Sequence, residues 1–408
     1  MVNEFFEFKD YGGTLSFYIF ELANFSTLAI FAIILYHCKY ISVNSLIVWI
    51  GLFLVPLLLN YFALSPMLFP DQFTYTKEAV ALKSSGLSSE VILAQNDGRM
   101  DSVFSVFVNP VTLATRILGL APIPNFMTLT SLAFANKFFL FLTFLWVKKY
   151  FHNENALLVA FLIPSLVLFS SLSLRDNLVI IFSMIFLINM LRGKPVVALL
   201  FAYPLITLKI QMLFILMLYF IGSIFFKANK SFLRLGIFSF VILIFALIFE
   251  ELILDVLNYY RRGFFAENLI IGDGGRGYAA FGLYAEAFID MLTLESLFEL
   301  FVVALTGLPR LMVMPLPWNW DNILYPIQFM ESLLLVYLYY WIPKRYNILH
   351  NQEFIFLTYC LIFGLMIYSL LVFNEGTFIR YRFALFYPFI FAVFYLGQKT
   401  EGIKKVDD

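Results

Sequence analysis

Two arginines stand close together in the segment 374–382, immediately before an apolar stretch. Arg380 and Arg382 are two residues apart, and Gly376 permits a tight turn before them. Because a guanidinium group is a planar fork that can bind two phosphate oxygens at once, this pair is a candidate phosphate-binding site. Glu375 in the same segment is a candidate acid or base. An ordinary loop between two helices is the alternative interpretation.

A second group of charges lies at the boundaries of apolar runs near the middle of the chain. Ser173 and Asp176 match a capping box, which would make Asp176 a helix-starting residue, although it is also a candidate catalytic group. Arg175 opposes the dipole of such a helix and is therefore a candidate anion ligand. Lys209 stands alone between two apolar runs, and it either snorkels to the interface or binds an anion.

The remaining candidates are an acidic residue and a proline-rich segment. Asp71 follows a long apolar run, and it is either a base at the mouth of a membrane cavity or a solvated loop acid. Arg310 and Trp318 lie in the segment 309–320, which contains three prolines. Trp318 fits either an interfacial anchor or a platform that stacks on a sugar ring.

Composition excludes most soluble functions. Hydrophobic residues make up 62% of the 408 residues and charged residues only 13%, about half the charged share of soluble domains. The formal net charge is zero, so nucleic acid is not a predicted partner. Neither a nucleotide-binding glycine motif nor a metal-ligand spacing is visible, so no cofactor and no metal are predicted.

Long apolar runs predict an all-α, polytopic membrane protein with about eleven spanning helices. The chain 1–408 is predicted to form a single membrane domain with two outer loops, 65–125 and 255–295. The segment 296–316 contains Gly, Pro and Arg, and is predicted to be a broken helix that is re-entrant or interfacial. The predicted spans are 14–36, 44–64, 126–147, 155–172, 176–192, 195–208, 210–226, 235–254, 325–342, 352–373 and 383–398.

Basic residues in short loops predict the orientation, because they gather on the cytoplasmic side of a membrane. The N-terminus is then outside and the C-terminus is cytoplasmic. The short connections on the outer side hold few basic residues, and these are the candidates Arg175, Lys209, Arg380 and Arg382. The basic side holds Lys39, Lys148, Lys149, Arg192, Lys194, Lys227, Lys230, Arg234, Lys344, Arg345, Lys399, Lys404 and Lys405.

In the order of these motifs the sequence resembles the bacterial O-antigen and capsule repeat-unit polymerases of the Wzy type, which are membrane glycosyltransferases with a GT-C-like arrangement. The resemblance covers most of the chain, although each motif alone is weak. It rests on Asp71 with Tyr75, Pro164 followed by Arg175–Asp176, Lys209 after a short apolar run, Pro315-Leu-Pro-Trp318, and Gly376–Thr377 with Arg380 and Arg382 before Pro388.

The resemblance implies that a glycan on undecaprenyl diphosphate is transferred to a sugar hydroxyl of an incoming lipid-linked repeat unit. It assigns the diphosphate to the arginines with support from Lys209, where an arginine would be expected. It assigns the acceptor proton to Asp71, with Glu375 as the second choice. The implied partners are a polyprenyl-diphosphate-linked oligosaccharide, membrane lipid and a chain-length regulator protein, and the implied location is the bacterial cytoplasmic membrane.

Two rival functions remain open, and a structural membrane protein without chemistry is a third alternative, against which the basic residues gathered on one side argue. An O-antigen ligase, or a glycosyltransferase that uses a polyprenyl-monophosphate sugar, needs the same parts, although a monophosphate donor needs fewer cations. A lipid-linked oligosaccharide flippase needs charges along a path at mid-depth in the membrane. Glu21, Lys137 and Glu331 lie within or beside predicted spans, but the strongest of the candidate charges lie at one face.

Overall fold

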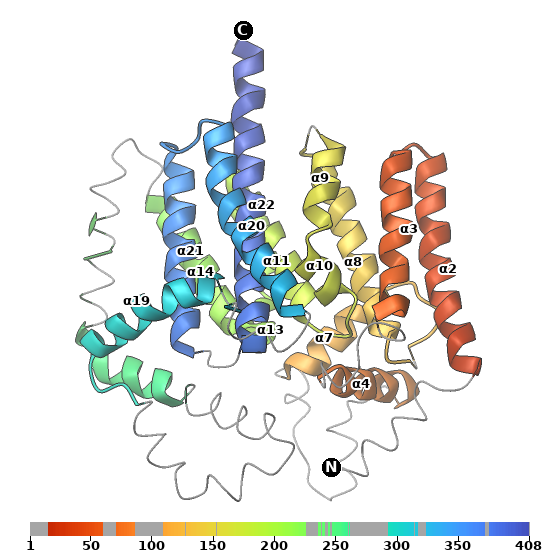
Figure 1. Cartoon of the computed structure of the whole chain (residues 1–408), viewed down its shortest axis with the longest axis horizontal. Coiled ribbons are helices and arrows are strands. Elements are labelled where there is room, and N and C mark those ends of the chain that lie inside the picture. Colours follow the sequence, from red (N-terminus) through yellow and green to blue (C-terminus); the bar gives the residue numbers. More distant parts are fainter. Residues whose placement is uncertain are drawn as a thin grey trace, which may run out of the picture. The chain divides into compact units, whose positions relative to one another are not determined.

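The computed structural model of the chain is all-helical over the residues that it describes (Figure 1). The chain divides into two compact units, here called the first unit (Met1–Phe186 and Val196–Leu213) and the second unit (Leu187–Pro195 and Phe214–Asp408). The structure describes residues 15–59, 71–85, 109–126, 128–151, 153–225, 293–313, 315–316, 324–371 and 375–407, together with scattered positions between 236 and 261.

The first unit contains helices that run roughly parallel to one another, with α4 lying across their ends (Figure 1). The helix α11 (Asp176–Leu191) contributes residues to both units. The other helices of the unit are α2 (Leu15–His37), α3 (Val43–Leu58), α4 (Asp71–Ser85), α7 (Pro110–Leu118), α8 (Ser131–Lys148), α9 (Glu154–Phe161), α10 (Pro164–Ser170), α12 (Pro195–Ala202) and α13 (Leu205–Leu208).

Local sequence explains where several of these helices begin. Ser42 caps α3 by accepting a hydrogen bond from the backbone N–H of Ser45, and Asn153 caps α9 by accepting one from Ala156. At α7, Asn109 is the cap and Pro110 is the first helical residue, a position where the missing N–H of proline costs nothing.

Aromatic packing around α8 forms the core of the first unit. The indole of Trp49 from α3 lies 4.8 Å from the ring of Phe141 and 5.4 Å from that of Phe144, both on α8. Phe161 at the end of α9 contacts the same indole at 5.9 Å. These rings are almost fully buried, so α8 is the helix against which α3 and α9 pack.

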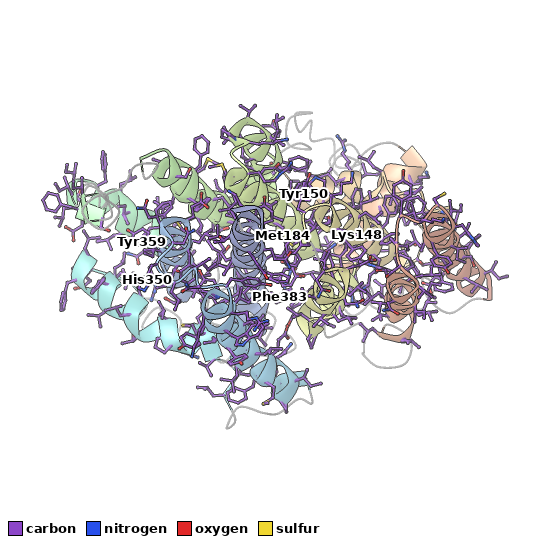
Figure 2. All side chains as sticks on the ribbon, turned by 90° about the horizontal axis from the view of Figure 1, so that it is seen from above. Lys148, Tyr150, Met184, His350, Tyr359 and Phe383 are labelled. Carbon is purple, nitrogen blue, oxygen red and sulfur yellow. The ribbon has the colours of Figure 1, made fainter. Side chains whose placement is uncertain are left out.

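The second unit is built on α21 and α22, with α19, α20 and α14 packed against them (Figure 1). Figure 2 shows the side chains that fill the spaces between neighbouring helices, among them Phe383 of α22, which is buried. The helices of this unit are α14 (Ile210–Phe225, whose first residues belong to the first unit), α19 (Leu297–Val313), α20 (Leu324–Arg345), α21 (Gln352–Leu371) and α22 (Glu375–Asp407).

Glycine permits one of these contacts. A Cβ on Gly222 of α14 would overlap the ring of Phe356 on α21. The same ring stacks on Tyr219 of α14 with 5.5 Å between the ring centroids. Small residues allow helices to approach closely in this way in membranes, where burial from water does not drive helices together.

Several helices are long and apolar enough to cross a membrane, which supports a polytopic membrane protein. Within the described residues four helical stretches of at least 18 residues meet this criterion, and α3, α11 and α14 are shorter apolar helices. Large apolar side chains such as Ile30 and Ile34 are exposed along α2, as expected for a lipid-facing surface. The four stretches are Ile19–His37, Ser131–Lys148, Gln352–Leu371 and Ile379–Glu401.

The structure corrects three details of the sequence prediction. The predicted span 155–172 is broken into α9 and α10, because Pro164 starts a new helix. The predicted span 195–208 is likewise broken at a turn before α13. The prediction of a broken helix in 296–316 was wrong, since α19 is continuous through Pro309 and runs obliquely to α21 (Figure 1).

Candidate functional site

A hydrogen bond joins two of the segments that the sequence singled out. The side-chain oxygen of Gln72, the second residue of α4, accepts a bond of 3.0 Å from the backbone N–H of Ser173. Gln72 is fully buried. Since Asp71 precedes Gln72 and Arg175 follows Ser173 by two residues, the start of α4 and the segment that carries Arg175 lie together in the first unit.

Two adjacent polar residues of α8 fix the same segment from the other side. The side-chain amide of Asn136 donates to the carbonyls of Leu172 and Leu174, at 2.8 and 2.9 Å. Asn177 at the start of α11 donates in turn to the backbone carbonyl of Asn136 at 3.0 Å. The backbone between α10 and α11, which would otherwise expose polar groups inside an apolar protein, is therefore bound on both sides.

The other α8 residue of this pair is Lys137, which is fully buried. Its ammonium group donates to the hydroxyl of Ser170 at 2.8 Å and to the carbonyl of Val167 at 3.2 Å. Both acceptors lie in the last turn of α10, where a cation is favoured by the helix dipole. Lys137 therefore holds the end of a half-helix, and this explains a charge at membrane depth without a transport path.

Asp176 and Lys209 are brought together as a buried pair. The Nζ of Lys209 lies 4.0 Å from a carboxylate oxygen of Asp176, and each side chain is only 4% exposed. The two charges offset each other where solvation is poor, which is the ordinary reason for such a pair. Arg175 beside them is half-buried, so of these three residues it is the one with a surface for a ligand.

The capping box predicted at Ser173 is not formed with that residue as the cap. Helix α11 begins at Asp176, and the carbonyl of Arg175 accepts the first bonds, from Leu178 and Val179. The hydroxyl of Ser173 instead donates to the carbonyl of Leu129. Ser173 thus binds neighbouring elements through both its backbone and its side chain.

Asp71 and Tyr75 both lie on α4, which further contacts attach to its surroundings. The side chain of Asp71 is half-buried, and that of Tyr75 is buried. One turn further along α4, the carboxylate of Glu78 accepts a 2.7 Å hydrogen bond from the hydroxyl of Thr112 on α7. These contacts hold Asp71 at a defined place near the Arg175 segment, as a base would require.

In the second unit another hydrogen bond joins two candidate segments. A terminal nitrogen of Arg382, which is buried on α22, donates to the carbonyl of Leu311 on α19 at 3.3 Å. Arg310 precedes that carbonyl and is exposed, whereas Arg380 lies half-buried two residues before Arg382. The carboxylate of Glu331 on α20 interacts electrostatically with Arg382. Arg382 is thus held by protein groups, and Arg310 and Arg380 are the more accessible cations.

The aromatic platform predicted at Trp318 lies outside the described residues, and so does the side chain of Glu375. Another aromatic pair is present beside the arginines. Tyr381, between Arg380 and Arg382, packs edge-to-face on Tyr368 of α21 with 5.2 Å between the ring centroids. Tyr368 is fully buried, whereas Tyr381 is half-buried, so Tyr381 is the ring of this pair that offers a sugar a surface.

Sequence reasoning missed the residues that join the candidate segments. Gln72 and Asn136 received no role, although Asn136–Lys137 is a polar pair within an otherwise apolar stretch and could have been noticed. The first unit gathers four of the candidates. The Gln72–Ser173 hydrogen bond brings together the segments of Asp71 and Arg175, and an ion pair joins Asp176 to Lys209. The candidates of the second unit are Arg310, Arg380 and Arg382, with Glu375 at the start of α22.

Comparison with known proteins gives no relative. No protein-family model matches the chain, and no curated protein or solved structure is detectably similar to it. The function is therefore inferred from the residues and their arrangement.

Proposed function

We propose that this chain is a membrane glycosyltransferase that polymerises polyprenyl-diphosphate-linked oligosaccharide repeat units at the outer face of the bacterial cytoplasmic membrane. The proposal includes eleven membrane crossings, with the N-terminus outside and the C-terminus in the cytoplasm. The observation that carries it is the Gln72–Ser173 hydrogen bond, because it gathers a carboxylate and an accessible arginine at one end of the first unit.

Accessible cations in each unit suit this reaction. A polymerase takes two lipid-linked diphosphates, one on the donor glycan and one on the incoming repeat unit. In the first unit, Arg175 is an accessible cation beside a buried ion pair. In the second unit, Arg310 and Arg380 form a separate set of accessible cations. We assign one diphosphate to each set, because one guanidinium group can bind two phosphate oxygens at once.

The roles of the residues follow from the bond changes. The acceptor hydroxyl attacks the sugar carbon, the bond from that carbon to the lipid diphosphate breaks, and the hydroxyl proton passes to a carboxylate. We assign the proton to Asp71 and keep Glu375 as the second choice. The charge that develops on the leaving diphosphate is stabilised by the accessible arginine of the unit that binds it, while the buried cation of the same unit, Lys209 or Arg382, contributes through its field.

The decisive experiment supplies the purified protein with one synthetic lipid-linked repeat unit and resolves glycan length on a gel. We expect a ladder from the wild type and its loss in Arg175→Ala and Arg380→Ala. Lys149→Ala, which removes a cation from the opposite ends of the first-unit helices, is the matched control and should retain the ladder.

Two other outcomes would change the assignment. No ladder with an authentic repeat unit would refute polymerisation, and a single transfer to a different glycan acceptor would identify a ligase. Comparison of Asp71→Asn with Glu375→Gln then identifies the base, since loss of a general base lowers the rate by about 100-fold to 10,000-fold.

A further inference from the structure

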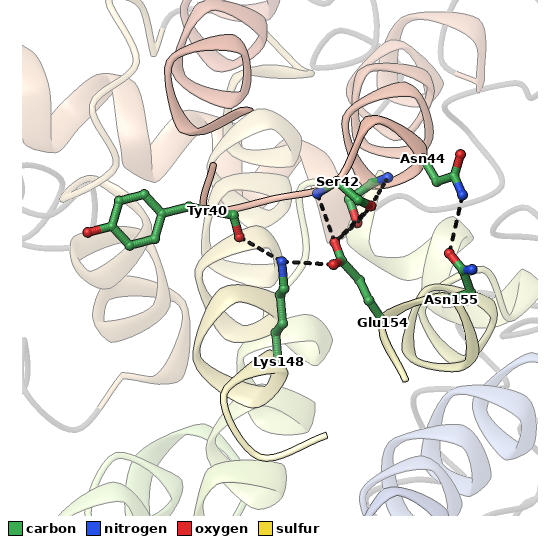
Figure 3. Close-up of polar contacts among 7 residues, drawn as sticks. Tyr40, Ser42, Asn44, Lys148, Glu154 and Asn155 are labelled. Carbon is green, nitrogen blue, oxygen red and sulfur yellow. Dashed lines mark hydrogen bonds and ion pairs between the residues drawn. The ribbon is translucent and has the colours of Figure 1, made fainter. Parts of the chain in front are cut away.

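A second polar cluster occupies the opposite end of the first unit, where α2 and α8 end and α3 and α9 begin (Figure 3). Lys148 donates to the carbonyl of Tyr40 at 2.7 Å and forms an ion pair of 2.8 Å with Glu154. The carboxylate of Glu154 also accepts bonds from the backbone N–H and the hydroxyl of Ser42, at 3.1 and 3.0 Å, and from the hydroxyl of Ser45. The loop after α2 is thereby attached to the loop after α8.

These contacts leave a positively charged pocket beside the cluster. The pocket has a volume of about 450 Å³, within the range of about 300 to 1,000 Å³ that small-molecule sites occupy. The lining contains two lysines, Lys39 and Lys148, and one acid, Glu154. The pocket therefore carries a net positive charge even when His37 is neutral. The lining residues are Tyr36, His37, Lys39, Ile41, Ser42, Lys148 and Glu154.

Glu154, the acid in the pocket lining, repels an anion only weakly. Glu154 already accepts hydrogen bonds from Ser42 and Ser45, and it pairs with Lys148. Its charge is therefore offset inside the cluster, which leaves the ammonium group of Lys39 for a ligand.

Backbone conformation fixes the place of Lys39. Its φ is +59°, in the left-handed region, and it closes α2: its own N–H donates to the carbonyl of Tyr36 and the next N–H to that of Leu35. Glycine is the usual residue at this position, and it occupies it after α11, where Gly193 has φ +71°. A lysine at this place carries a steric cost that glycine would avoid, and it presents a cation at the pocket.

We propose that this pocket binds a phosphate group, with Lys39 and His37 as ligands. The proposal is independent of the glycosyltransferase assignment. The ligand chemistry is that of an anionic phospholipid headgroup or of a free phosphate. The exposed Tyr40 beside the pocket and the neighbouring lysines are typical of helix ends at a membrane surface.

The test is thermal unfolding of the purified protein in neutral detergent, with added phosphatidylglycerol, phosphatidylcholine or inorganic phosphate. We expect phosphatidylglycerol to raise the midpoint and phosphatidylcholine to leave it unchanged. A rise with inorganic phosphate alone would identify a free phosphate as the ligand. No rise with any of them would overturn the proposal.

Two variants locate the site. Lys39→Gly keeps the left-handed backbone and removes the cation, so the protein should fold while its apparent affinity for the anion falls about fivefold. Lys149→Ala removes the same charge at the end of α8 outside the pocket lining, and its affinity should match the wild type. Equal losses in the two variants would indicate a diffuse surface charge and would refute the pocket.

Discussion

Gln72 accepts a 3.0 Å hydrogen bond from the backbone N–H of Ser173, although the two residues are 101 positions apart in the sequence. The bond links the helix that carries Asp71 to the segment that carries Arg175. Its loss would move the proposed base relative to the proposed phosphate ligand.

Gln72→Met should lower the rate of glycan transfer about tenfold or more, because small displacements of reacting groups are costly. The buried N–H of Ser173 is left without its acceptor, which should cost about 1–3 kcal/mol of stability. Thr76→Val is the control, since Thr76 is buried one turn along α4 and its hydroxyl donates to the carbonyl of Gln72 within the same helix. Equal transfer rates for the two variants would argue against a positioning role.

The buried pair of Asp176 and Lys209 should show strong coupling in stability. Lys209→Met leaves the carboxylate of Asp176 without this paired cation in a poorly solvated place, so we expect a loss of about 3 kcal/mol. The double variant Lys209→Met with Asp176→Leu should recover part of that loss. Chemical unfolding of the wild type, the two single variants and the double variant in one detergent gives the coupling energy, and strictly additive losses would contradict the pairing.

Gly222→Ala should destabilise the second unit by about 1–3 kcal/mol, because the new methyl group would overlap the ring of Phe356. Gly51→Ala is a matched control. Gly51 lies in α3, and a Cβ there would meet nothing within 4 Å. We expect that variant to unfold at the same temperature as the wild type or above it. The reverse order of midpoints would disprove the close approach of α14 and α21.

The lowered pKa of Glu154 leads us to expect that the stability of the protein depends on pH. Partial burial would raise the pKa of its carboxyl, but bonds from Lys148, Ser45 and Ser42 outweigh burial and hold the pKa below the ordinary value of 4.5. A lowered folded-state pKa contributes stability that is present above pH 4.5 and is lost as the pH falls through the folded value.

Unfolding midpoints of the wild type and Glu154→Gln, measured between about pH 7 and pH 3, would check this dependence. The advantage of the wild type over the variant should shrink below pH 4.5. A constant difference at every pH would show that the carboxylate charge contributes nothing.

The native cysteines can report the predicted orientation. Cys38 is exposed directly after α2, whereas Cys360 is buried within α21. A membrane-impermeant maleimide should label Cys38 in inside-out vesicles but not in intact spheroplasts. Cys38→Ser should abolish the signal. Labelling in spheroplasts would place the end of α2 on the outer face and invert the proposed topology.

Hydropathy was sufficient to locate most helices. The run 14–36 corresponds to α2 and the run 176–192 to α11, because a long apolar stretch in a membrane protein is helical throughout. Hydropathy did not reveal α4 and α7 within 65–125, since both are short and α4 is polar. Hydropathy also predicted one continuous helix across Pro164, because the residues there are apolar although the helix is interrupted.

The candidate site was harder to predict for a different reason. Residue types identify Arg175 and Asp176 as unusual, but their meaning depends on contacts with distant segments. That Lys209 pairs with Asp176 cannot be read from spacing, and neither can the bond from Ser173 to Gln72. The same residue types therefore divide into buried and accessible charges only once the helices are packed.

The hydrogen bonds from Lys137 to the end of α10 also have a consequence for how the chain enters a membrane during synthesis. α9 and α10 are each short, and the last turn of α10 leaves carbonyl groups that lipid cannot satisfy. α8 precedes them in the chain and carries the ammonium group that bonds Val167 and Ser170. Insertion of the 154–170 segment is thus expected to depend on α8 already being beside it, so that the translocon releases the two as a hairpin.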